Sequence, residues 1–218
     1  MNKILDSKTL HFLEKKLVHE LSRYELFQNP QVNASPRAIG DTVQEVIANI
    51  LPDCIPAGLI DEFSSSFARR AMEDVAFFDA DGNYYAIDIK THNLSTDFNM
   101  PNLISVERLA RFYRDEKKYF VVLLVEYTVK EGHLTFIDTH FIPIEHLDWS
   151  CLTIGALGWG QIQIANSNRI TVDRDNTRID WMISLCDMMD RFYPKEISKI
   201  TERIEYFRTV RAFWESKK

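Results

Sequence analysis

The chain contains an uninterrupted apolar run, FVVLLV at residues 120–125, which ends at Glu126. Six apolar residues in a row suit a strand that is buried on both faces, because a half-exposed strand alternates apolar and polar residues. The run is far shorter than the roughly 20 residues of a membrane-spanning helix. It therefore predicts a strand in the centre of a sheet.

Helical patterns precede and follow this run. Leucines recur at residues 10, 13, 17 and 21, and a second amphipathic pattern, from Val43 to Ile50, is expected to stop at Pro52. Ser105 is a candidate cap for a short helix that carries Val106 and Leu109.

Two further helices are expected near the C-terminus, one starting at Asn176 or Thr177 and the other at Pro194. The last one is expected to turn its apolar residues inward: Ile197, Ile200, Ile204 and Phe207. With strands expected around the Lys130–Gly132 turn, the order of elements predicts an α/β fold. We expect a central mixed β-sheet flanked by helices, in a single domain over residues 1–218.

Composition supports an ordinary globular protein, with 45% apolar and 27% charged residues and a net charge of −6. The opening segment is amphipathic and charged, unlike a signal peptide, so we expect a cytoplasmic protein with no membrane partner. Cys54, Cys151 and Cys186 are widely separated and are expected to be reduced and mostly buried. The acidic balance argues weakly against non-specific nucleic-acid binding, although arginines and lysines gather between residues 102 and 118.

The segment EDVAFFDADGNYYAIDIK, residues 73–90, reads as two strands joined by a turn. Residues two apart on a strand share a face, so Asp88 and Lys90 project together while Ile87 and Ile89 point to the apolar side. A three-residue loop, Ala80 to Gly82, would bring Asp74 opposite Asp88 and would require a positive φ at Gly82.

Two neighbouring carboxylates repel each other unless a cation lies between them. Oxygen ligands suit Mg²⁺, so Asp74, Asp88 and the carbonyl of Ile89 are the expected metal ligands. This arrangement is typical of a phosphodiesterase site. Lys90 is expected to position the water that attacks the phosphate and to stabilise the charge that develops on it. Glu45, on the second helix, is the candidate third carboxylate, although a solvated helix face explains it about equally well.

A later segment concentrates glycines 155, 158 and 160 around Trp159, ahead of two short strand patterns. Glycine clusters of this kind indicate a loop whose backbone approaches something closely.

An Asp on one strand followed by Asp-x-Lys on the next resembles the PD-(D/E)xK nuclease signature. The continuation IDIKTHNLSTDFNMPNLIS is similar to the same stretch in the blunt-cutting type II restriction endonucleases of the EcoRV, HincII and HpaI group. The later segment LGWGQIQIANSNRITVDRDNTRIDWMISL also resembles that group, and the likeness runs from about Gly40 to about Tyr193.

The resemblance implies a restriction-endonuclease-like fold and a homodimer that cuts both strands of a palindromic double-stranded DNA site with Mg²⁺, paired with a cognate DNA methyltransferase. It assigns the catalytic core to Asp74, Asp88 and Lys90, with Glu45 as the helix carboxylate. It also assigns DNA contacts to Asn99, Asn102, Gly158, Trp159, Gln161 and Gln163. The alternatives are a DNA repair or junction-resolving nuclease of the same fold and a non-catalytic DNA-binding module. The target sequence does not follow from the loop composition.

Overall fold

The protein is described by a computed structural model that covers residues 2–29, 31–33, 35–64, 74–96, 101–165 and 170–218. These residues fall into two compact units, Met1–Asp173 and Arg174–Lys218. The single domain expected over residues 1–218 stays a prediction. Within the described ranges, no helix combines the length and the apolar character needed to cross a membrane.

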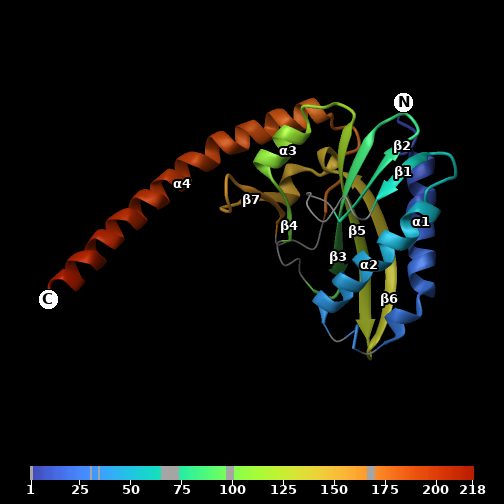
Figure 1. Ribbon diagram of the computed structural model, residues 1–218, viewed down its shortest axis with the longest axis horizontal. Helices are drawn as coiled ribbons and strands as arrows, with labels where there is room; N and C mark the ends of the chain where they lie inside the picture. The colour runs from blue at the N-terminus through green and yellow to red at the C-terminus, as the bar shows by residue number, and fades with distance from the viewer. Residues whose placement is uncertain (1, 30, 34, 65–73, 97–100, 166–169) are drawn as a thin grey trace. The chain divides into compact units, whose positions relative to one another are not determined.

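A five-stranded sheet forms the centre of the first unit, with strands in the order β1-β2-β3-β5-β6 (Figure 1). The strands are β1 (Ile60–Ser64), β2 (Val75–Asp79), β3 (Tyr84–Asn93), β5 (Lys118–Lys130) and β6 (His133–Pro143). β3 and β5 are parallel, whereas the other neighbours are antiparallel. The expected α/β class with a mixed sheet is therefore confirmed.

The apolar run that predicted a central strand lies in β5, between β3 and β6. All six of its side chains, from Phe120 to Val125, are at most 1% exposed. Because successive side chains point to opposite faces, both faces of the sheet are covered at this strand.

Two helices pack against the sheet, α1 (Ser7–Arg23) on β6 and α2 (Pro36–Cys54) on β3 (Figure 1). The four leucines of α1 are buried, as their spacing predicted. α2 begins after Ser35, whose side chain caps it, and continues two residues past Pro52. The expected stop at Pro52 is wrong because the N–H of Ile55 donates to the Leu51 carbonyl and closes one more turn.

A second, three-stranded sheet has the order β4-β8-β7, with β4 (Asn102–Ser105), β7 (Leu152–Gly155) and β8 (Gln161–Ile164). α3 (Val106–Phe112) follows β4 directly, and the Ser105 side chain caps it as expected by accepting from the Arg108 N–H. The remaining short turns of 3₁₀-helix are η1 (Glu25–Gln28), η3 (Ile144–His146) and η4 (Trp149–Cys151).

The second unit contains one helix, α4 (Arg178–Glu215), capped by Thr177. The expected second start at Pro194 is wrong, because a proline removes one backbone hydrogen bond and can be accommodated inside a longer helix. The apolar residues expected to face inward are exposed instead, including Ile197 at 64% and Phe207 at 65%. Cys54 and Cys151 are buried as expected, whereas Cys186 is exposed.

Candidate active site

The β2–β3 hairpin has the loop that the acidic residues require. The Asp79 N–H donates to the Asn83 carbonyl at 2.9 Å, so Ala80, Asp81 and Gly82 form a three-residue loop. Gly82 has φ +76°, a left-handed conformation that glycine adopts without strain. The register runs on through Val75 opposite Ile87, so the predicted three-residue loop is confirmed. Asp74 lies beyond the paired residues and its N–H donates to the Ile87 carbonyl at 2.9 Å, so its placement directly opposite Asp88 stays a prediction.

β3 extends well past the end of β2. The described pairing of β3 with β2 stops at Ile87, whereas its pairing with β5 continues to Asn93. Asp74 stands just before β2, and its Oδ2 accepts a 2.7 Å hydrogen bond from the Ile89 N–H. The Asp74 carboxylate thus accepts from the Ile89 N–H in place of a backbone carbonyl of β2. The Ile89 N–H and C=O both point to this edge of β3.

Gln44 of α2 lies at the same edge of β3, and the sequence did not identify it as a site residue. Its Nε2 lies 3.2 Å from Asp74 Oδ2 and 3.4 Å from the Ile89 carbonyl oxygen. Helical spacing puts Gln44 on the same side of α2 as Gly40, whose backbone is close to the Thr91 side chain of β3. An uncharged amide drew no attention beside the neighbouring Glu45.

Asp88 and Lys90 form a close ion pair on β3, with Nζ 2.6 Å from Oδ1. Both side chains are shielded, at 9% and 19% exposed. Burial, with a smaller contribution from the negative charge of Asp74, raises the pKa of the Asp88 carboxyl to about 7 against the lowering effect of Lys90. The second oxygen, Oδ2, is buried and has no hydrogen-bond partner among the described residues.

A buried carboxylate oxygen without a donor is the observation that fits a cation here. Asp74, Asp88 and the Ile89 carbonyl are all oxygen ligands, which suits Mg²⁺. The described residues hold no group of three or more His, Cys, Asp or Glu side chains that could bind a metal. Two carboxylates and a carbonyl remain compatible with Mg²⁺, because this ion typically keeps several waters and phosphate oxygens in its shell.

Glu45 is placed differently from its neighbour. It is exposed on α2, and in the described part of the chain no hydrogen bond or ion pair joins its side chain to Asp74, Asp88 or Lys90. The structure therefore brings Gln44 to the carboxylates and does not bring Glu45 to them. The assignment of Glu45 as a third carboxylate stays a prediction.

Three of the residues expected to contact DNA, Asn102, Gln161 and Gln163, come together in the three-stranded sheet. Asn102 of β4 pairs with Gln163 of β8, and the Gln163 Nε2 donates to the Asn102 Oδ1 at 2.6 Å. Gln161 lies two residues before Gln163 on β8 and therefore shares its face. Ile162 and Ile164 are fully buried on the opposite face, so this small sheet has one apolar and one polar side.

Gly155 makes room for the amide of Gln163. A Cβ at this position would lie 2.6 Å from Gln163 Oε1, closer than real contacts allow. The close approach that the glycines predicted is therefore made, at Gly155, by a side chain of the next strand. Gly158 and Gly160 have φ values of +57° and +121° and serve the turn between β7 and β8.

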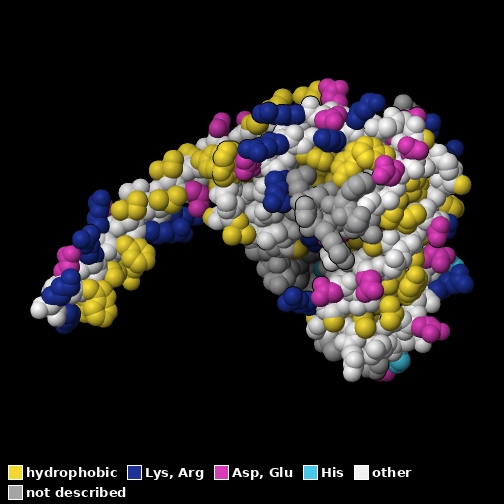
Figure 2. Space-filling model, in the orientation of Figure 1, with side chains coloured by type: hydrophobic (Ala, Val, Ile, Leu, Met, Phe, Trp, Pro, Cys, Tyr) yellow, Lys and Arg dark blue, Asp and Glu magenta, His cyan; other side chains and the backbone are white. Residues whose placement is uncertain are grey.

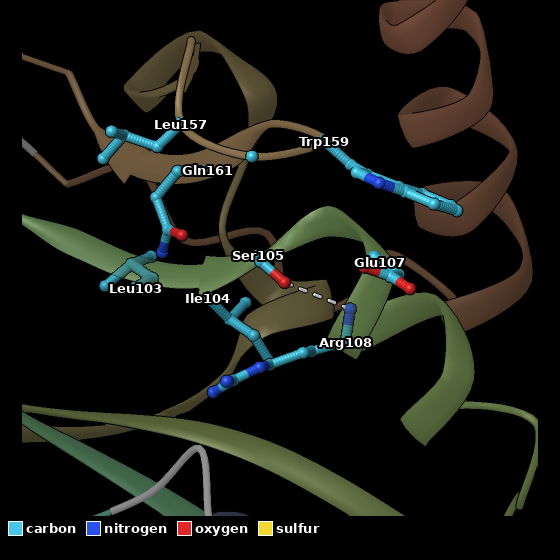
Figure 3. A pocket seen from close by; sticks show the side chains of 9 residues that line it. Leu103, Ile104, Ser105, Glu107, Arg108, Leu157, Trp159 and Gln161 are labelled. Carbon is cyan, nitrogen blue, oxygen red and sulfur yellow. Dashed lines mark hydrogen bonds between the residues drawn. The ribbon is translucent and has the colours of Figure 1, made fainter.

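A pocket of about 420 Å³ opens between this turn and the start of α3 (Figure 3). Leu157, Gly158, Trp159 and Gln161 line it on the turn side. Ser105, Glu107 and Arg108 contribute from the other side (Figure 3). Trp159 is 61% exposed, which leaves a large aromatic surface beside polar groups.

The basic segment around α3 presents cations of two kinds. Arg111 is held by Glu107 of the previous turn, with 2.6 Å between Nη2 and Oε1. Arg108 and Arg114 are exposed and have no ion-pair partner in the ranges the structure describes. Asn99, the remaining residue expected to contact DNA, lies outside the described residues.

A scan of protein-family models and a search of curated proteins find no match to the chain.

Proposed function

We propose that the protein is a Mg²⁺-dependent type II restriction endonuclease with a restriction-endonuclease-like fold. It acts as a homodimer, hydrolysing both strands of duplex DNA at a short palindrome and leaving 5′-phosphate and 3′-hydroxyl ends. Its resemblance to the EcoRV, HincII and HpaI group implies that these ends are blunt. The observation that carries this proposal is the buried Asp88 carboxylate, which has Lys90 on one oxygen, no partner on the other among the described residues, and Asp74 close enough to raise its pKa.

The chain's own residues have separate roles in this reaction. Asp74 and Asp88, with the Ile89 carbonyl, would hold Mg²⁺, which when bound acidifies water and withdraws charge from the phosphate. The Ile89 N–H and the Gln44 amide fix the orientation of the Asp74 carboxylate. Lys90 presents its ammonium beside Asp88, where it attracts a phosphate and stabilises the negative charge that develops as water attacks phosphorus.

Recognition is assigned to a different surface. Asn102, Gln161 and Gln163 present amide groups, which both donate and accept hydrogen bonds and can therefore read base edges. Arg108 and Arg114, which are exposed, would contact phosphates, and such contacts contribute affinity without sequence information. Trp159 and Gly158 lie at the tip of the same turn.

One experiment tests the activity and separates it from its rivals. The purified chain is incubated with phage DNA in Mg²⁺, and the fragment ends are sequenced. We expect defined fragments, blunt ends at a single palindrome, and complete inhibition by EDTA. Cleavage only of four-way junctions or damaged duplex would favour a repair or junction-resolving nuclease, and binding without any cleavage would favour a DNA-binding module.

A further inference from the structure

The pocket between the β7–β8 turn and α3 has both apolar and polar walls. Its volume of about 420 Å³ falls within the range of small-molecule sites, roughly 300 to 1,000 Å³. Leu103, Ile104 and Leu157 line it with apolar groups, and Trp159 adds an aromatic side chain that is 61% exposed. An exposed tryptophan provides a flat surface on which another planar ring can stack. The apolar part of the pocket therefore suits a flat aromatic ligand.

The polar groups of the pocket favour one kind of aromatic ligand. Glu107 offers a carboxylate, Ser105 a hydroxyl and Gln161 an amide. Glu107 lies beside Trp159 at one end of the pocket, and Gln161 lies at the other (Figure 3). A carboxylate only accepts hydrogen bonds, whereas a hydroxyl and an amide also donate them. The pocket therefore suits a flat ring with donors on one edge and acceptors on another.

Among the four DNA bases, only guanine presents two adjacent donors, N1–H and N2–H₂, which a single carboxylate accepts together. Its O6 and N7 atoms are acceptors on the neighbouring edge. Adenine and cytosine each place an amino group next to an accepting ring nitrogen, and thymine has one N–H between two carbonyls. Beside a carboxylate, these three bases would leave acceptors facing each other, which is unfavourable. The donors and acceptors of the pocket thus select guanine.

We propose that the pocket binds a guanine base that is not paired in a duplex. The base stacks on Trp159, and Glu107 accepts hydrogen bonds from its N1–H and N2–H₂ groups. Ser105 and Gln161 donate to O6 and N7. A base turned out of the DNA helix is read in this way, through stacking and hydrogen bonds to its exposed edge. That source of the guanine rests on the proposed function, whereas the guanine site itself does not.

Arginines around α3 adapt the pocket to a charged nucleotide. Arg111 pairs with Oε1 of Glu107 at 2.6 Å and offsets its charge, and the carboxylate keeps lone pairs for two further donors. Arg108 also lines the pocket, and its side chain runs past Ile104 and away from Trp159 (Figure 3). Figure 2 shows Lys and Arg side chains on the surface around α3. A nucleotide with its base on Trp159 therefore has a cation available for its phosphate.

Nucleotide binding by the full chain in EDTA tests the site without any nuclease activity. Calorimetric titrations with dGMP, dAMP, dCMP and dTMP give the four dissociation constants. We expect dGMP to bind at least about 10-fold more tightly than the other three, because one carboxylate accepts two hydrogen bonds from guanine alone. Equal binding of all four nucleotides, or no saturable binding of dGMP below about 10 mM, would overturn the proposal.

Two exposed tryptophans provide a matched pair of variants. Trp159→Ala is expected to weaken dGMP binding about 10-fold or more, because it removes the stacking partner of the base. Trp214→Ala is the control, because Trp214 is 64% exposed but lies on α4 and does not line the pocket. Its dGMP affinity should stay within about threefold of the parent value. Equal losses in the two variants, or no loss in Trp159→Ala, would overturn the assignment, and urea midpoints check that both variants remain folded.

Glu107→Gln tests the hydrogen bonds to guanine separately from stacking. The amide replaces one acceptor by a donor, so the ratio of the dAMP to the dGMP dissociation constant should fall about 10-fold. Arg111→Ala is the control, because it removes the ion-pair partner and leaves the carboxylate in place. Any change in attraction for the phosphate cancels in the ratio, which should stay within about threefold of the parent value. An unchanged ratio in Glu107→Gln would overturn the assignment of guanine.

Oligonucleotides distinguish a DNA base from a free nucleotide. A single-stranded thymine oligonucleotide with one central guanine is expected to bind at least about 10-fold more tightly than dGMP, because neighbouring phosphates add contacts. No such gain would identify a free guanine nucleotide as the ligand and overturn the DNA source. In the duplex site that the cleavage experiment defines, a fluorescent guanine analogue should brighten on binding in Ca²⁺ as it leaves the stack. Absence of cleavage together with a retained preference for dGMP would overturn the proposed function and leave the guanine site in place.

Discussion

The β2–β3 hairpin and the three-stranded sheet hold their polar groups in opposite ways. In the hairpin, Asp74, Asp88 and Lys90 are shielded, and each has a fixed partner. In the sheet, Asn102 and Gln163 hold one another at the surface. Shielded charges interact strongly and tolerate few changes, whereas exposed amides can exchange partners with little loss of stability. Under the proposed function, chemistry belongs to the first region and selection of DNA sequence to the second.

The largest expected effect tests the hairpin. We expect Asp88→Asn and Lys90→Ala each to reduce the single-turnover cleavage rate by about 10³-fold or more, because each removes a charge that acts in the transition state. Cleavage of a cognate duplex in Mg²⁺ measures the rate. A rate within tenfold of the parent for either variant would remove the assigned site.

Binding and stability controls separate lost chemistry from lost structure. Asp88→Ala is expected to bind cognate DNA in Ca²⁺ at least as well as the parent, because a carboxylate facing phosphate is gone. Asp88→Asn should not lower the urea midpoint at pH 8, because it removes a buried charge that has one oxygen without a partner. A large loss of stability would mean that the ion pair is structural.

The next effect compares two adjacent residues of α2. Gln44→Ala is expected to reduce activity or Mg²⁺ affinity by about 10-fold to 100-fold, because Gln44 orients the Asp74 carboxylate. Glu45→Ala serves as the matched control and should cost less, since Glu45 is exposed. Cleavage rates over a Mg²⁺ titration measure both variants. The reverse order of losses would instead support the sequence-based role of Glu45 as a third carboxylate.

Local rules predicted the hairpin well, and they failed where distant segments meet. Strand alternation and the loop length fixed the register around Gly82, because both depend on a few neighbouring residues. The contact between Asn102 and Gln163 joins residues 61 positions apart, and no local pattern specifies it. In α4, spacing predicted a helix, but burial of its apolar side was assumed from the usual behaviour of single chains. Periodicity shows that a helix has an apolar side and does not show what covers it.

A smaller effect is expected in the three-stranded sheet. Gln161→Ala or Trp159→Ala should reduce discrimination between cognate and near-cognate sites by about 1 to 3 kcal/mol, as for the loss of a base contact. Stability should change little, because Trp159 is exposed and Gln161 is only partly buried. Competition binding with single-base variants of the site measures discrimination. An equal loss on cognate and random DNA would place these residues outside sequence recognition.

The arginines around α3 allow a complementary test, of binding affinity instead of sequence discrimination. Arg114→Ala should weaken binding to all sequences alike and reduce the salt dependence of the binding constant by about one unit of slope. Arg111→Ala should have less effect, because Arg111 is already paired with Glu107 at 2.6 Å. Binding titrations at several salt concentrations measure both. A sequence-dependent loss for Arg114→Ala would show that it contacts bases.

The smallest effect lies outside both regions and concerns His140 on β6. A hydrogen bond from the His140 ring to the Glu126 carboxylate raises the pKa of His140 above its usual value, against the lowering effect of burial, and the charges of Glu126, Asp138 and Glu14 add to the rise. A histidine with a raised folded-state pKa stabilises the fold fully below its unfolded pKa, near 6.5, and loses this contribution as pH rises through the folded value. Because the side chain is 36% exposed, solvent screening should keep the contribution below about 1 kcal/mol.

Urea unfolding at pH 6 and pH 8.5 should therefore show a larger loss of stability with pH for the parent than for His140→Gln. The Asp88 carboxyl, whose pKa is raised to about 7, also lowers the stability of the folded protein as pH rises. It does so equally in both proteins, so the difference between them isolates His140. Identical pH dependence in the two proteins would show that the Glu126 contact does not persist in solution.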